Sequence, residues 1–124
     1  MWLALAAMCL GARLPWSVQR GLGRLIGALA LRVATARRRA ARINLALCFP
    51  EMSPEQRERL LRESFRDLGI GLFEFARAWW GSVTPMRRTV RIEGLEQLDG
   101  IRAQGRGVLM VSGHFMTLEM CGRL

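Results

Sequence analysis

One acid–base pair stands out among the side chains that could do chemistry. His114 is the only histidine of the chain, and Glu119 follows it five positions later. An imidazole is well suited to act as a general base near neutral pH, and a neighbouring carboxylate can hold one tautomer and stabilise the charged ring. The pair could therefore remove a proton from an attacking hydroxyl. The spacing alone also fits a buried structural histidine and a glutamate that complements a helix N-terminus.

The elements around His114 decide whether the two side chains can meet. In an uninterrupted helix, five residues place two side chains about 140° apart, so His114 must lie in a turn and Glu119 in the first helical turns. The continuous apolar run 108–111 predicts a strand covered on both faces, which Ser112 and Gly113 end, and a helix is expected from Phe115 onward. Ligands gather at the carboxyl ends of strands in open α/β sheets, which is where this pair would lie.

The preceding segment predicts the start of the same sheet. Residues 89–92 read as a short strand, and residues 95–104 read as a short helix around Gly100. Strand, helix, strand and helix in succession are typical of an α/β domain, of which this chain would hold the beginning.

A long helix is predicted after residue 53. Ser53 is a good N-cap, Pro54 suits the first helical position, and Gln56 lies three positions after the cap. Gly69 and Gly71 weaken the helix locally but permit close packing. The large apolar residues recur at intervals of three and four, which predicts one buried stripe made of Leu61, Phe65, Leu68, Leu72, Phe75 and Trp79.

The positive charge is concentrated in the first part of the chain. All 19 basic residues are arginines, and the first fifty of the 124 residues hold eight of them and no acid. This asymmetry indicates an anionic partner, either lipid headgroups or nucleic acid. Residues 2–12 are apolar throughout, and residues 21–36 mix apolar residues with arginines. These patterns predict membrane-anchoring helices, a transmembrane helix and an interfacial one, over residues 1–36. An ordinary solvated helix is the alternative.

Several function classes are disfavoured by composition. A hydrophobic content of 51% excludes general disorder. The three cysteines are far apart and odd in number, so a disulfide framework is not expected, and with one histidine neither is a metal site. The basic segment lacks stacking aromatic residues, which argues against a nucleic-acid partner.

Two segments carry a resemblance to a known family. The run RRRAARINLALCFPEMSPEQRERLLRESFRDLGIGLFEFARAWW, residues 37–80, resembles the N-terminal region of the lauroyl/myristoyl (late) acyltransferases that complete lipid A. The block SGHFMTLEMCGR, residues 112–123, is similar to their catalytic motif of a histidine, four residues and an acid. The resemblance favours the catalytic interpretation of His114 and Glu119.

The resemblance implies a bacterial inner-membrane acyltransferase whose catalytic part lies on the cytoplasmic side. Such an enzyme moves a fatty acyl chain, here expected to be laurate, from acyl carrier protein to the 3-hydroxyl of an acyl chain on the lipid A precursor. It would use no cofactor beyond the acyl donor, and it would contact anionic inner-membrane lipids. His114 would be the general base, and Glu119 would orient and stabilise its imidazolium. Residues 1–36 would be the anchor, and residues 37–124 the N-terminal part of the α/β acyltransferase domain.

The family's members are more than twice as long, so the chain is expected to be a fragment that carries the pair without a complete site. Two alternatives remain. A glycerolipid acyltransferase shares a similar pair, although residues 37–80 argue against it. The other is a non-enzymatic, membrane-anchored basic module.

Overall fold

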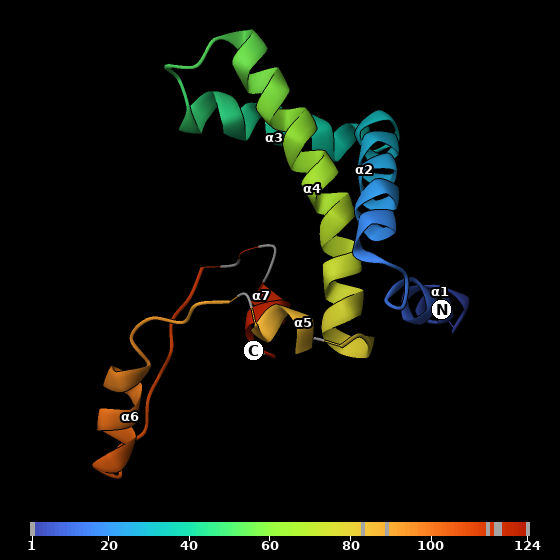
Figure 1. Cartoon of the computed structure of the whole chain (residues 1–124). Coiled ribbons are helices and arrows are strands. Elements are labelled where there is room, and N and C mark those ends of the chain that lie inside the picture. The colour runs from blue at the N-terminus through green and yellow to red at the C-terminus, as the bar shows by residue number, and fades with distance from the viewer. Residues whose placement is uncertain (1, 83, 89, 114, 116–117, 124) are drawn as a thin grey trace.

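The computed structural model describes residues 2–82, 84–88, 90–113, 115 and 118–123. In Figure 1 the long helix α4 runs through the middle of the molecule, with α1, α2, α3 and α7 packed against it and α6 standing away from them. The helices are α1 (Trp2–Gly11), α2 (Trp16–Val33), α3 (Thr35–Cys48), α4 (Pro54–Trp80), α5 (Thr84–Arg87), α6 (Leu95–Ala103) and α7 (Leu118–Cys121).

The region expected to form one helix over residues 21–36 is divided between two helices. Helix α2 starts five residues earlier, directly after Pro15, and ends at Val33. Ala34, with φ −84° and ψ 63°, leaves the helical conformation, and α3 begins at the next residue. Helix α3 ends at Cys48, two residues before Pro50, which cannot continue a helix. The predicted division of the chain between residues 36 and 37 falls inside α3, and it stays a prediction.

The predicted start of α4 is confirmed. Ser53 has an extended backbone, and its hydroxyl accepts the backbone N–H of Gln56 at 3.3 Å. The Gln56 side chain in turn accepts the backbone N–H of Ser53 at 2.7 Å. Two N–H groups that the helix cannot pair are thereby satisfied, which is the capping box that the sequence indicates.

Glycines bring α2 and α4 into backbone contact. A Cβ built on Gly27 would collide with the carbonyl oxygen of Phe65 and lie 2.7 Å from the Cα of Arg66. A Cβ on Gly69 would collide with the carbonyl oxygen of Gly23 and lie 2.7 Å from the amide nitrogen of Gly27. No side chain fits between the two helices here, because the backbones occupy the space. The close packing predicted for Gly69 is therefore confirmed.

This backbone contact explains why only two of the six residues of the predicted buried stripe are buried. Leu61 and Phe65 are buried, as predicted, and the buried line continues through Gly69 and Ala76. It thus follows steps of four, four and seven residues along the face that meets α2. The other four predicted members are at least 39% exposed, because they lie to one side of this line: Leu68, Leu72, Phe75 and Trp79.

A buried glutamine ties the turn between α1 and α2. The Gln19 side chain is fully buried, and its amide nitrogen lies 2.9 Å, 3.1 Å and 2.9 Å from the carbonyl oxygens of Gly11, Ala12 and Leu14. These carbonyls lie at the end of α1 and just after it, where helical partners run out. From α4, the guanidinium of Arg77 donates to the same Leu14 oxygen at 3.4 Å, which links the turn to the central helix.

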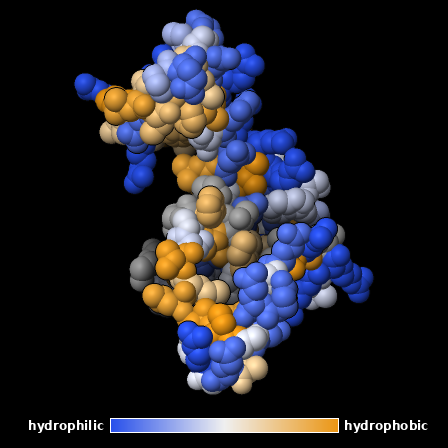
Figure 2. Space-filling view, turned by 90° about the vertical axis from the view of Figure 1, so that its left-hand side faces the viewer, coloured by the Kyte–Doolittle hydropathy of each residue, from blue (hydrophilic) through white to orange (hydrophobic). Residues whose placement is uncertain are grey.

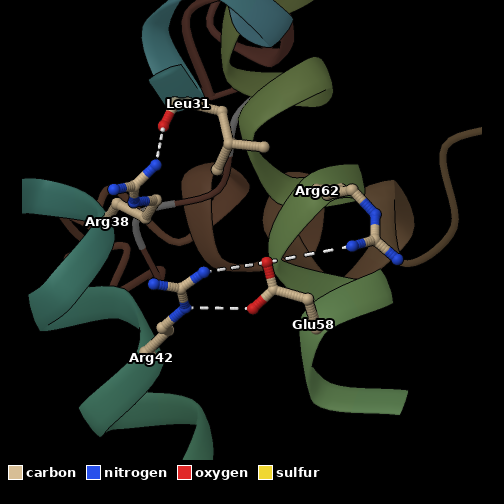
Figure 3. Close-up of polar contacts among 5 residues, drawn as sticks. All are labelled: Leu31, Arg38, Arg42, Glu58 and Arg62. Atoms are coloured by element: carbon tan, nitrogen blue, oxygen red, sulfur yellow. Dashed lines mark hydrogen bonds and ion pairs between the residues drawn. The ribbon is translucent and has the colours of Figure 1, made fainter. Parts of the chain in front are cut away.

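Arginines fasten the corner between α2, α3 and α4 (Figure 3). Arg38 donates to the carbonyl oxygen of Leu31 at 3.1 Å, close to the end of α2. Arg42 holds the Glu58 carboxylate through two hydrogen bonds of 3.0 Å, and Arg62 lies 3.8 Å from the same carboxylate. The hydrogen bond from Arg42 lowers the pKa of Glu58 below its usual value.

The α/β fold predicted from the sequence is wrong for the residues that the structure describes. These residues form helices and irregular segments without a strand. Residues 90–94 and 106–113 have no regular structure, whereas residues 95–103 form the expected helix α6. A strand needs a hydrogen-bonding neighbour, and the described part of the chain provides none for the apolar run at 108–111. The side chains of this run are 42–90% exposed.

The predicted membrane-anchoring helices are also corrected. Among the described residues, each helix is either too short or too polar to cross a membrane. Helix α1 has only ten residues, and the eighteen residues of α2 include Arg20, Arg24 and Arg32.

We predict that Gly27→Ala lowers the free energy of unfolding by about 1–3 kcal/mol or more, since its Cβ must push α2 and α4 apart. Gly21→Ala is the matched control, because Gly21 lies in α2 with open space around its Cα, and alanine there improves helix propensity by up to about 1 kcal/mol. Urea unfolding followed by circular dichroism measures both. Equal stability of the two variants would contradict the close contact.

We also predict a pH dependence for the pair of Arg42 and Glu58. Because the pKa of Glu58 is lowered in the folded state, its contribution is complete above the usual pKa of a glutamate and is lost as the pH falls through the folded-state pKa. Glu58→Gln therefore has a lower free energy of unfolding than the parent at neutral pH, and the loss is smaller than that in Gly27→Ala. In acid, Glu58→Gln and the parent are equally stable. A difference that persists at low pH would contradict the role of the ion pair.

Candidate active site

The predicted acid Glu119 lies on α7, a single helical turn near the end of the chain. The turn begins where the Leu118 amide donates to the carbonyl of Phe115 at 3.1 Å, and it continues as the Gly122 amide donates to Leu118 at 3.0 Å. Met120 is buried, whereas Glu119 is exposed. The helix thus anchors itself through Met120 and leaves the carboxylate of Glu119 accessible to solvent or substrate.

An arginine fastens this turn to the central helix. Arg123 donates to the carbonyl oxygens of Ala78 and, at 3.4 Å, of Gly81, which lie at the C-terminal end of α4. A cation suits this position, since the last carbonyls of a helix have no helical partner and carry partial negative charge. Arg87 donates to the backbone oxygen of Arg123 at 3.0 Å. The segment that carries Glu119 is therefore held at the end of α4 and beside α5.

An open hollow lies between α4 and α7. It has a volume of about 350 Å³ and is lined by Ala78, Trp79, Glu119, Gly122 and Arg123. Its lining thus combines an aromatic residue, Trp79, with an acid and an arginine. Such a mixture of an apolar wall and a few polar groups is usual in sites that bind small molecules.

His114 lies outside the described residues, so its distance from Glu119 is not part of this structure. The backbone on its N-terminal side has no regular structure, and Ser112 and Gly113 are exposed. The aromatic ring of Phe115 lies against Gly113, whose added Cβ would be 3.0 Å from it. The role of His114 and Glu119 as a catalytic pair stays a prediction.

Two residues of the hollow were given no chemical role by the sequence. Trp79 was assigned to the buried stripe, yet 61% of it is exposed and it forms a wall of the hollow. Arg123 stands four positions after Glu119, but its guanidinium contacts residues more than forty positions earlier. No local pattern predicts partners at that distance; the only signal is a basic residue close to a helix end.

Metal-ligating side chains do not gather in threes or more anywhere in the described part of the chain. The three cysteines, Cys9, Cys48 and Cys121, are free. The chemistry available at the hollow is thus that of a carboxylate, a guanidinium and an indole ring.

Comparison with known proteins identifies relatives along the whole chain. Residues 1–124 match the family described as bacterial lipid A biosynthesis acyltransferase. The chain is 42% identical over 123 residues to the lipid A biosynthesis palmitoleoyltransferase of Escherichia coli, covering 99% of this chain and 40% of that protein. It is 38% identical over 122 residues to the lipid A biosynthesis lauroyltransferase of the same organism, covering 98% and 40%.

The myristoyltransferase of lipid A biosynthesis from Escherichia coli is 30% identical over 119 residues, which cover 96% of this chain and 37% of the relative. No solved structure matches the chain. The chain spans about two fifths of the length of the curated relatives it matches. Because the family match extends from the first residue to the last, the chain belongs to the bacterial lipid A biosynthesis acyltransferases.

Proposed function

We propose that this chain forms the N-terminal part of an enzyme that transfers a fatty acyl group to a lipid A precursor. The observation that carries the proposal is the family match over all 124 residues, together with the exposed Glu119 at an open hollow. The donor is the thioester of acyl carrier protein, and the acceptor is the 3-hydroxyl of an acyl chain already attached to the precursor. The relatives' names support the precursor as the substrate class.

The mechanism needs no nucleophile from the protein. His114 takes the proton of the acceptor hydroxyl, and the resulting oxygen attacks the thioester carbonyl. The carbon–sulfur bond then breaks, the thiolate leaves, and the proton on the imidazole neutralises it. Glu119 orients the imidazole and stabilises its charged form, as a carboxylate beside a histidine does in other general-base sites.

The identity of the acyl group is a finer part of the proposal. Laurate is the group that the sequence resemblance favours, and a lauroyltransferase is among the relatives at 38% identity. The palmitoleoyltransferase is 42% identical over a similar length. A donor series of lauroyl, myristoyl and palmitoleoyl thioesters therefore has to be compared side by side, and the group transferred fastest identifies the natural donor.

We propose that the reaction takes place at the cytoplasmic face of the bacterial inner membrane. The relatives' names assign them to lipid A biosynthesis. The first fifty residues carry eight arginines and no acid, and two of these arginines, Arg37 and Arg39, are exposed on α3. Such a surface is suited to contact with anionic lipid headgroups.

We predict that His114→Ala lowers the rate of acyl transfer about 10²- to 10⁴-fold, since it removes the general base. Glu119→Ala lowers it less, because other groups can still hold the imidazole. The assay is transfer from acyl carrier protein to the lipid A precursor, in a polypeptide that includes this chain and has the length of the relatives. Melting temperatures are measured beside it. Unchanged transfer by His114→Ala would refute the mechanism, and parallel losses of melting temperature and activity would show that His114 is structural.

The contacts of Arg123 make it a positioning residue for Glu119. Arg123→Ala releases α7 from the end of α4, and displacement of a reacting group by about 1 Å can cost about 10²-fold in rate. We predict a fall in kcat with little change in KM, and partial recovery in Arg123→Lys, which keeps the charge. Arg106→Ala, at an exposed arginine in the loop after α6, is the control. Equal kcat values for Arg123→Ala and the control would contradict this role.

A further inference from the structure

A row of large apolar side chains stands exposed on α4. Its members follow one another at intervals of four, three and four residues, so they share one face of the helix. Figure 2 looks onto the side of the molecule that carries α5, α6 and α7, and it shows exposed apolar patches between hydrophilic regions. The row consists of Leu68, Leu72, Phe75 and Trp79, which are 46%, 49%, 39% and 61% exposed.

The row leads into the hollow that Glu119 lines. Trp79 is both the last member of the row and a wall of the hollow. The rings of Phe75 and Trp79 have centroids 6.0 Å apart at an angle of 42°, so the apolar surface continues without a break into the hollow. The row and the hollow are therefore one continuous surface.

The backbone contact with α2 leaves this row open. Successive residues of an α-helix are rotated by about 100° around its axis, and this rotation places the row between two other strips of the α4 surface. On one side is the buried line through Leu61, Phe65 and Gly69, which meets α2, and on the other is Ala78, which lines the hollow beside α7. The row thus lies beside the contact with α2 and stays partly exposed.

We propose that the row from Leu68 to Trp79 is the track along which the fatty acyl chain of the substrate lies, with its thioester end at the hollow. This inference rests on the function proposed above. The eleven residue steps from Leu68 to Trp79 span about 16 Å along the helix axis, which is close to the length of an extended medium-chain acyl group. The track would measure the acyl chain from a fixed end beside Glu119.

An acyl chain fits this surface better than another protein segment does. The row is one side chain wide, which suits a single acyl chain. It ends at the hollow lined by the candidate acid, which is where the reactive thioester end of the acyl chain would have to lie. The hydrophobic effect attracts the methylene groups of the acyl chain to the row. The binding free energy from this attraction becomes smaller with each methylene group that is removed from the acyl chain. Leu72 lies about midway along the row. A larger side chain at this position would therefore obstruct a long acyl chain but not a short one.

Photolabelling of the 124-residue chain tests the placement directly. The probe is an uncharged dodecanoyl thioester of N-acetylcysteamine with a diazirine either at the terminal carbon or beside the carbonyl. We expect the terminal diazirine to label Leu68 or Leu72 and the other one to label Phe75 or Trp79, as mapped by mass spectrometry. Labelling that does not depend on the diazirine position, or that falls on α2 or α3, would overturn the proposal.

A matched pair of variants tests chain-length selection. Leu72→Trp fills the middle of the track. Leu25→Trp adds the same bulk on α2, at a leucine that is 67% exposed. Leu72→Trp is expected to weaken binding of the dodecanoyl thioester about tenfold relative to the hexanoyl thioester. Leu25→Trp leaves this ratio unchanged.

Because Leu72 is half-exposed and Leu25 is mostly exposed, both positions accept a larger ring without overpacking. Circular dichroism verifies the fold of each variant. An unchanged binding ratio in Leu72→Trp would overturn the proposal. The proposal would also be overturned if Leu72→Trp changed the sedimentation coefficient of the chain instead of the binding ratio, since the row would then be a contact between two copies of the chain.

The outcomes separate this inference from the proposed function, because labelling and binding require no acyl transfer. Ordered labelling of the row in a polypeptide that transfers no acyl group supports the track and contradicts the function. Acyl transfer to the lipid A precursor with labels elsewhere supports the function and contradicts the track.

Discussion

The contact between the backbones of α2 and α4 is the constraint on which the remaining structure depends. Gly23 and Gly27 of α2 meet Gly69 of α4 so closely that no side chain fits between them. The contact aligns the two longest helices and determines which face of α4 is buried. It also leaves the large apolar residues of α4 outside the interface. A single added methyl group at this point would move the scaffold against which α1, α3 and α7 pack.

Helix ends, rather than a large apolar core, join the other elements to this pair. Gln19 holds the carbonyls that follow α1, Arg38 holds a carbonyl close to the end of α2, and Arg123 holds carbonyls at the end of α4. Each of these side chains satisfies backbone groups that a helix leaves unpaired, and each comes from a different part of the chain. The abundance of arginine thus has a structural use besides any role in binding anions.

The site follows from the same arrangement. Helix α4 carries Trp79 at its end, and Arg123 fastens α7 there, so Glu119 faces a hollow with one aromatic wall. An exposed apolar row extends from that hollow along α4. The proposed acyl transfer would use both features. Glu119 would orient the general base, and the apolar row would hold the acyl chain.

The sequence by itself determined the elements whose signals are local. The cap at Ser53, the end of α3 before Pro50 and the family motif around Glu119 were all readable, because each depends on residues within a few positions. The tertiary structure alone decided which face of α4 is buried, because hydrophobic periodicity cannot show that glycine backbones displace the large side chains. It also decided that Arg123 joins α7 to α4, across more than forty residues. The run 108–111 has the composition of a strand, but a strand exists only with a paired neighbour, and no residue pattern within one segment can supply that.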